Sequence, residues 1–119
     1  MAKELVQRRY YQEGDIIFFE GDQGNTAYVM QSGEVEIYTF VNGVEKVLGK
    51  FTKDDIFGEM GLIIDEPRMA SARCTQTASI VIISKSAFEN RLEKIDPFVR
   101  GLIKLMIYHI RKNIVSPIS

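Results

Sequence analysis

Short β-rich runs separated by turn residues fill the chain from about residue 10 to residue 84. Asn42-Gly43, between two such runs, is the pair most typical of a two-residue hairpin turn. Residues 35–40 alternate apolar and polar side chains, as a half-buried strand does. The predicted strands are residues 16–19, 27–31, 35–40, 44–50, 70–76 and 79–84. This spacing favours an antiparallel jelly roll over alternating strand–helix units.

The pattern changes to helix after this β-rich region. Ser86-x-x-Glu89 has the form of a capping box and predicts a helix from there to about residue 95. Asp96-Pro97 gives a second start, with a cap residue followed by proline at the first helical position. The second helix, to about residue 113, is apolar over a surface wider than one stripe. It is expected to cover something on more than one side, with a helix that simply packs against the barrel as the alternative, and the breadth of the surface alone does not decide between them.

Composition sets limits on the function. With 119 residues the chain is expected to form a single domain, and its net charge of −1 gives no reason to bind nucleic acid or an anionic membrane. No apolar run is long enough to span a bilayer, and the N-terminus lacks the apolar run of a signal peptide. The single cysteine, Cys74, excludes an internal disulfide and agrees with a reducing compartment. A cytoplasmic domain is therefore expected.

Residues 57–71 combine a glycine turn, a carboxylate, a short apolar stretch and an arginine behind a proline. A turn that enters a helix offers unpaired N–H groups and a positive dipole end, which suit an anion. Arg68 follows Glu59 by nine residues and can return to the same place to donate two hydrogen bonds to a phosphate. Glu59 repels an anion, so its partner is expected to be a neutral hydroxyl, such as that of a ribose. The alternative is a plain structural ion pair.

The pattern Phe57-Gly58-Glu59-x-x-Leu62 followed by Pro67-Arg68-x-Ala70-Ser71 resembles the phosphate-binding cassette of the cyclic nucleotide-binding domain family. The resemblance extends upstream through residues 14–24 and 27–37 and covers roughly residues 8 to 113. That family includes the catabolite activator protein, the regulatory subunits of cAMP-dependent protein kinase and domains of cyclic-nucleotide-gated channels. The resemblance implies a mainly β jelly roll (double-stranded β-helix) over residues 10–84. It also implies a short cassette helix, and C-terminal helices over residues 86–113 that end in a lid.

The resemblance also implies roles for single residues. Glu59 would accept a hydrogen bond from the ribose 2′-OH, and Arg68 would pair with the equatorial oxygen of the cyclic phosphate. Backbone N–H groups near the turn would complete the anion site. The ligand-binding residues expected on this basis are Phe57, Gly58, Glu59, Met60, Gly61, Arg68, Met69, Ala70 and Arg111.

The contacts to the base are less well specified. Leu48, Phe51 and Met60 are candidates on the barrel side, with a plain core role as the alternative. On the lid side, Arg111 and Ile114 lie near the positions that contact the base in channel-type domains. Arg111 is equally well placed as a solvated cation near a helix C-terminus.

Met69 indicates which nucleotide is preferred. Members of the family that favour cGMP often have threonine directly after the arginine, where its hydroxyl meets the guanine amino group. A methionine offers only a weak acceptor, so cAMP is expected to be favoured and cGMP is the alternative ligand. A gap-filling role for Met69 is compatible with this interpretation.

These features predict a non-enzymatic sensor that responds through its terminal helix, by which two copies can also pair. The only histidine, His109, cannot supply the several ligands of a phosphodiesterase metal site, so neither catalysis nor a metal or other cofactor is expected. One alternative is a domain of the same fold that has lost ligand binding, and another is a receptor for a different small anionic nucleotide. No helix-turn-helix follows the terminal helix in this sequence, so DNA binding is not expected, and the effector is not specified.

Overall fold

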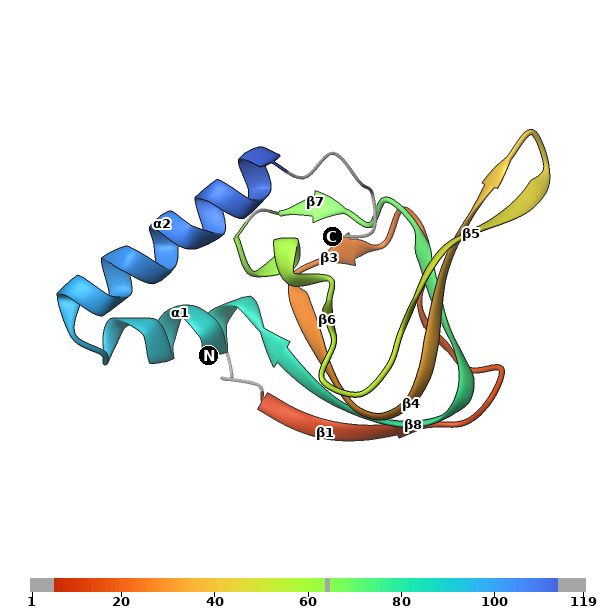
Figure 1. Ribbon diagram of the computed structural model, residues 1–119, viewed down its shortest axis with the longest axis horizontal. Helices are drawn as coiled ribbons and strands as arrows, with labels where there is room; N and C mark the ends of the chain where they lie inside the picture. The colour runs from red at the N-terminus through yellow and green to blue at the C-terminus, as the bar shows by residue number, and fades with distance from the viewer. Residues whose placement is uncertain (1–5, 64, 114–119) are drawn as a thin grey trace.

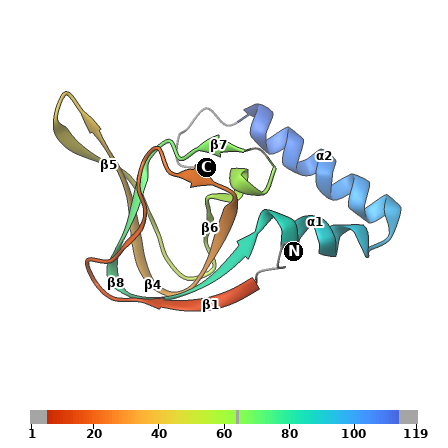
Figure 2. The same ribbon diagram turned by 180° about the vertical axis from the view of Figure 1, so that it is seen from behind.

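The computed structural model describes residues 6–63 and 65–113, which form a curled antiparallel sheet with two helices at one end (Figures 1 and 2). Six strands form the main sheet, with the path β1-β8-β4-β5, β2 paired to β8 and β6 paired to β4. The elements are β1 (Val6–Tyr11), β2 (Ile16–Phe18), β3 (Gln23–Gly24), β4 (Thr26–Val41), β5 (Val44–Phe51), β6 (Ile56–Phe57), the 3₁₀ helix η1 (Glu59–Leu62), β7 (Glu66–Pro67), β8 (Ser71–Ser84), α1 (Lys85–Glu93) and α2 (Pro97–Asn113). The predicted mainly β fold with C-terminal helices is confirmed. Strand β1 was not predicted, because most of its side chains are exposed and its sequence does not alternate.

Two long strands replace what the sequence divided into four. β4 has 16 residues and β8 has 14, and they pair along most of their length. The separation into residues 27–31 and 35–40, and into 70–76 and 79–84, was wrong. Register shifts near residues 30–35 interrupt the alternation without ending the strand. At this bend Gly33 has φ +85°, and a Cβ there would lie 2.4 Å from the Thr77 carbonyl oxygen.

The hairpin between β4 and β5 is the one that the sequence predicted. Val41 pairs with Val44, and the two residues between them have positive φ, 53° for Asn42 and 78° for Gly43. Positive φ at both central positions is what a type I′ turn requires, and its twist matches that of the strands. The hairpin projects from the rest of the barrel (Figure 1).

Aromatic rings pack against one another inside the barrel. Phe57 is fully buried and stacks on Tyr28, with ring centroids 5.0 Å apart, and on Phe51 at 5.2 Å. Leu48 and Phe51 are partly buried against this core. Cys74 is also buried, and burial raises the pKa of its thiol, as expected for an unreactive structural cysteine.

The helices begin at capped residues, but not both as predicted. Ser84, not Ser86, is the N-cap of α1, since its hydroxyl accepts a hydrogen bond from the Ala87 N–H at 3.1 Å. The chain leaves β8 directly into this cap, so the helix starts two residues before the predicted capping box. Asp96 caps α2 as predicted, accepting from the N–H groups of Phe98 and Val99.

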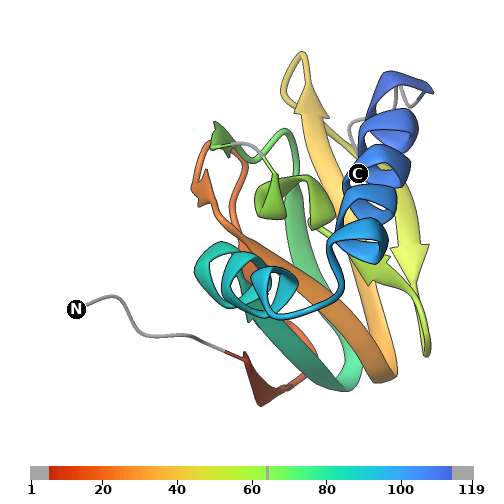
Figure 3. The ribbon, with the colours of Figure 1, turned by 90° about the vertical axis from the view of Figure 1, so that its left-hand side faces the viewer.

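Helix α2 lies beside α1 and outside the barrel (Figure 3). Many of its apolar side chains are exposed, and Phe98 is 76% exposed. Neither helix in the described part of the chain has the length and hydrophobicity needed to cross a bilayer. Much of the wide apolar surface predicted from the sequence is therefore exposed among the residues that the structure describes.

Replacement of Gly33 by alanine should destabilise the fold far more than the same change at Gly43. Both glycines have positive φ, which costs an L-residue about 1–2 kcal/mol. Only at Gly33 does the added Cβ meet backbone, so a clash adds to that cost, whereas nothing lies within 4 Å at Gly43. Denaturant unfolding of Gly33→Ala, Gly43→Ala and the parent protein measures the difference. Equal losses in the two variants would contradict this account of the bend.

Candidate functional site

A two-stranded ribbon holds the backbone of Arg68 independently of its side chain. β3 and β7 pair through Gln23–Pro67 and Gly24–Glu66. The Arg68 N–H donates to the Asp22 carbonyl, and the Gly21 N–H donates to the Arg68 carbonyl, both at 2.8 Å. The loop from 19 to 22 and the segment after η1 therefore hold each other in place.

The Arg68 side chain turns inward and is 9% exposed. Its Nη2 donates to the Thr26 carbonyl at 2.7 Å and to Thr26 Oγ1 at 3.0 Å, and its Nη1 donates to the Gly58 carbonyl at 3.2 Å. The guanidinium carbon lies 4.4 Å from the centroid of the Phe18 ring and 5.6 Å from that of Tyr28. Burial lowers the pKa of Arg68, but an arginine remains charged. Among the described residues its Nε has no hydrogen-bond partner.

Glu59 lies at the start of η1, next to this arginine in the fold. Gly58 precedes it with φ 71°, a left-handed conformation that turns the chain into the short helix. The Glu59 Oε2 atom is buried and has no hydrogen-bond partner among the described residues. Burial raises the pKa of the Glu59 carboxyl, while a backbone hydrogen bond and the charge of Arg68 lower it by less. The Arg68 guanidinium, which can only donate, and the Glu59 carboxylate thus lie in one site. Each has an atom that makes no hydrogen bond to the described residues.

Three glycines allow the polypeptide to pack this closely. A Cβ on Gly24 would lie 2.7 Å from Arg68 Nε, and one on Gly58 would lie 2.8 Å from Arg68 Nη1. A Cβ on Gly61 would lie 2.9 Å from the carbonyl oxygens of Gly24 and Thr26. Larger residues at these positions would displace the Arg68 side chain or the carbonyl groups to which it donates.

The structure brings together most of the residues that the sequence singled out, but not all. Phe57, Gly58, Glu59, Met60 and Gly61 surround the turn, and Arg68 returns to it. Ala70 is buried in the core, and Met69 is 66% exposed. The side chain of Arg111, and all of Ile114, lie outside the described residues.

The other residues that touch Arg68 were not predicted from the sequence to belong to the site. Thr26, Tyr28 and Phe18 all contact the guanidinium. The spacing of Thr26 and Tyr28, two apart on a strand, places both on one face and could have indicated the first two.

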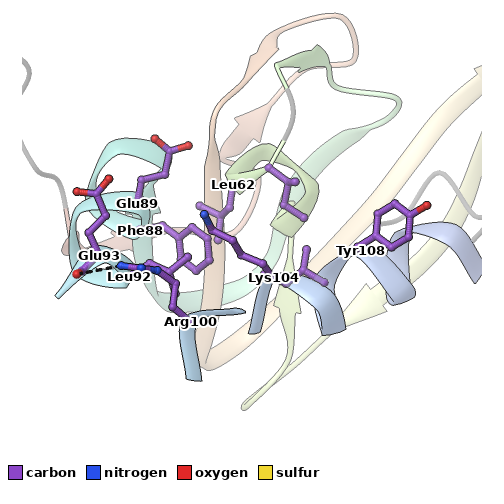
Figure 4. A pocket seen from close by; sticks show the side chains of 10 residues that line it. Leu62, Phe88, Glu89, Leu92, Glu93, Arg100, Lys104 and Tyr108 are labelled. Carbon is purple, nitrogen blue, oxygen red and sulfur yellow. Dashed lines mark hydrogen bonds between the residues drawn. The ribbon is translucent and has the colours of Figure 1, made fainter. Parts of the chain in front are cut away.

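A hollow lies beside the cassette, between η1, α1 and α2 (Figure 4). Its volume is about 340 Å³. Leu62 reaches it from η1, Phe88 and Leu92 from α1, and Lys104 and Tyr108 from α2. The Arg100 Nη1 atom donates to the Glu93 carbonyl at 3.3 Å across the α1–α2 turn. Among the residues that the structure describes, no group of three or more His, Cys, Asp or Glu side chains is arranged to hold a metal.

Glu59→Gln should raise the free energy of unfolding at pH 7.5, because the neutral amide removes a partly desolvated charge. Because the pKa of Glu59 is higher in the folded than in the unfolded protein, protonation of Glu59 stabilises the fold. This stabilisation is fully present below the pKa of the unfolded state, about 4.3, and is lost as the pH rises through the pKa of the folded state. The advantage of the variant should therefore shrink as the pH falls towards 4.

Denaturant unfolding at pH 4 and pH 7.5 checks this, with the exposed Glu13→Gln as a control for the change in net charge. A Glu59→Gln protein that is less stable than the parent at pH 7.5 would show that Arg68 needs this carboxylate as a partner in the free protein.

Comparison with known proteins agrees with this geometry. The family model of the cyclic nucleotide-binding domain matches residues 8–94. The chain is 33% identical over 97 residues to a cAMP-dependent protein kinase regulatory subunit of Hypocrea atroviridis, covering 82% of this chain and 20% of that protein. It is 27% identical over 113 residues to the cyclic AMP receptor protein of Thermus thermophilus, covering 94% of this chain and 52% of the receptor.

Among solved structures, the EAL enzyme Bd1971 in its halfsite-occupied form superposes with a TM-score of 0.81 at 33% identity, covering 92% of this chain and 100% of that one. The chain thus spans only a part of the kinase regulatory subunits and about half of the receptor protein that it matches. The match of the family model over most of the chain, together with the buried arginine and glutamate of its cassette, shows that this chain belongs to the cyclic nucleotide-binding domain family.

Proposed function

We propose that the chain binds a cyclic nucleotide monophosphate at Arg68 and Glu59 and acts as a non-enzymatic sensor. One observation carries this proposal: Arg68 Nε and Glu59 Oε2 are both buried and both lack a partner among the described residues. Leaving such groups unpaired costs about 1–3 kcal/mol each, so a ligand that satisfies both is strongly favoured. A cyclic phosphate accepts from the arginine, and the adjoining ribose hydroxyl donates to the carboxylate.

The charges also suit a cyclic monophosphate. A cyclic phosphodiester carries a single negative charge, which one arginine and the N–H groups at the start of η1 can match. Glu59 disfavours additional anionic groups nearby. A domain of this fold that has lost its ligand would have no need to keep both buried ionisable groups, so we favour binding over a purely structural role.

We favour cAMP over cGMP. The relatives named as cAMP-dependent or cyclic AMP proteins support the first nucleotide. Met69 has no hydroxyl to meet a guanine amino group, although its exposure leaves it free to contact a base of either kind. The EAL enzyme Bd1971 has been solved in both a cAMP-bound and a cGMP-bound form, so the preference is expected to be one of degree.

We further propose that ligand binding is transmitted to α1 and α2. Thr26, whose carbonyl accepts from Arg68, pairs in register with Ser84, the N-cap residue of α1. Lys85 Nζ lies 3.3 Å from Asp65 Oδ2 and joins α1 to the segment after η1. The hollow next to η1 leaves room for α2 to approach the cassette. We infer that its exposed apolar side chains pack against the bound nucleotide or against a second copy of the chain.

Arg68→Ala should weaken cAMP binding by more than about tenfold, because a hydrogen bond to a charged group contributes about 1.5–3 kcal/mol. Calorimetric titration of the variant and the parent with cAMP and cGMP measures this. Arg73→Ala is a matched control, since it removes an arginine that pairs instead with Glu36 and Glu45. A folded Arg68→Ala protein with unchanged affinity for cAMP would contradict the proposal.

Saturating cAMP should slow amide hydrogen exchange in α2, because the helix gains contacts when the cassette is occupied. The β4–β5 hairpin around Asn42-Gly43, which projects from the barrel, should be unaffected and acts as an internal control. If slowing is confined to η1 and residues 65–71, the nucleotide binds without a response in the terminal helix.

A further inference from the structure

Thr26 offers two oxygens to the same nitrogen of Arg68. Nη2 donates to its carbonyl at 2.7 Å and to its hydroxyl oxygen at 3.0 Å. A guanidinium has no acceptor, so the hydroxyl must accept this bond and keep its only hydrogen for another group. Tyr28 supplies that group, because its hydroxyl oxygen lies 3.0 Å from Thr26 Oγ1. The lone pair of Thr26 is thereby directed at Arg68.

Aromatic rings restrict the same guanidinium. The Phe18 ring lies 4.4 Å from its central carbon, and the Tyr28 ring lies 5.6 Å away. Tyr28 is itself fixed, since it stacks on the fully buried Phe57 with an angle of 12° between the rings. Attraction between a cation and a ring face holds Arg68 without using its donors.

The position of Thr26 is fixed independently of Arg68. It is the first residue of β4 and pairs in register with Ser84 of β8. The carbonyl of its neighbour Asn25 accepts from the Lys85 N–H at 2.9 Å. The sheet therefore fixes the position of Thr26, and Thr26 in turn holds the Arg68 side chain.

We propose that Thr26 is a positioning residue that orients Arg68 for the cyclic phosphate; this inference rests on the phosphate-binding function proposed above. With Nη2 bonded to Thr26, the buried Nε remains as a donor without a partner among the described residues. Orientation of a planar donor group decides which of the two exocyclic phosphate oxygens it meets. Thr26 thus determines how sharply the site distinguishes these oxygens, without touching the nucleotide.

The test is calorimetric titration of the parent, Thr26→Val, Thr26→Ser and Thr39→Val with cAMP and with the two phosphorothioate diastereomers of cAMP. In each diastereomer sulfur replaces a different exocyclic oxygen, so their affinity ratio reports the orientation of Arg68. Thr39 is a matched control on the same strand, because its hydroxyl donates to Glu20 Oε1 and not to the site.

Thr26→Val should weaken cAMP binding by about fivefold to tenfold and move the diastereomer ratio towards one. Thr26→Ser, which restores the hydroxyl, and Thr39→Val should keep both the affinity and the ratio of the parent. Should Thr26→Val fail to fold, Tyr28→Phe replaces it, since it removes the acceptor of the Thr26 hydrogen and is expected to change the ratio in the same direction.

An unchanged ratio in Thr26→Val overturns the inference, whether affinity is unchanged or reduced, because a purely structural role weakens both diastereomers equally. A parent protein that binds cAMP without distinguishing the diastereomers also overturns it. Absence of cAMP binding by the folded parent instead overturns the proposed function, and the role of Thr26 with it.

Discussion

A buried cation is the constraint around which the cassette is built. Removing the Arg68 guanidinium from water is costly, and the protein offsets this with three hydrogen bonds to Thr26 and Gly58 and with the faces of two aromatic rings. Carbonyl groups and rings stabilise the charge but do not neutralise it. Glu59, the nearby carboxylate, is itself desolvated. The free cassette therefore holds a buried arginine, whose charge the carbonyl groups and rings stabilise, beside a partly desolvated carboxylate.

Much of the surrounding fold follows from this requirement. Gly24, Gly58 and Gly61 allow backbone to approach where any Cβ would collide with the arginine or with its carbonyl partners. The β3–β7 ribbon fixes the Arg68 backbone, and β4 presents Thr26 from the sheet. Because β8 runs directly into α1, the same sheet connects the cassette to the helices. The site and the route that we propose for a response to the ligand thus share a few residues.

The sequence predicted the architecture because its signals were local. Asn42-Gly43 specified the hairpin, and Asp96 specified the start of α2. Continuity of β4 was missed because the register shifts at Gly33 break the alternation that predicts a strand. Ser86 was predicted to be the N-cap of α1 because Ser86-x-x-Glu89 has the form of a capping box. The helix starts earlier because β8 ends at Ser84, whose hydroxyl caps α1 instead.

For the site, the turn and the arginine were recognisable from their spacing. The hydrogen bonds from Arg68 to Thr26 could not be predicted from spacing, because the two residues are 42 positions apart in the sequence and are brought together only by the fold. Calorimetric titration of the unmodified protein with cAMP and cGMP is the decisive experiment for the proposed cAMP-binding function. Micromolar or tighter binding of cAMP, with weaker binding of cGMP, would support that function. No heat with either nucleotide, together with no shift in thermal unfolding, would contradict it.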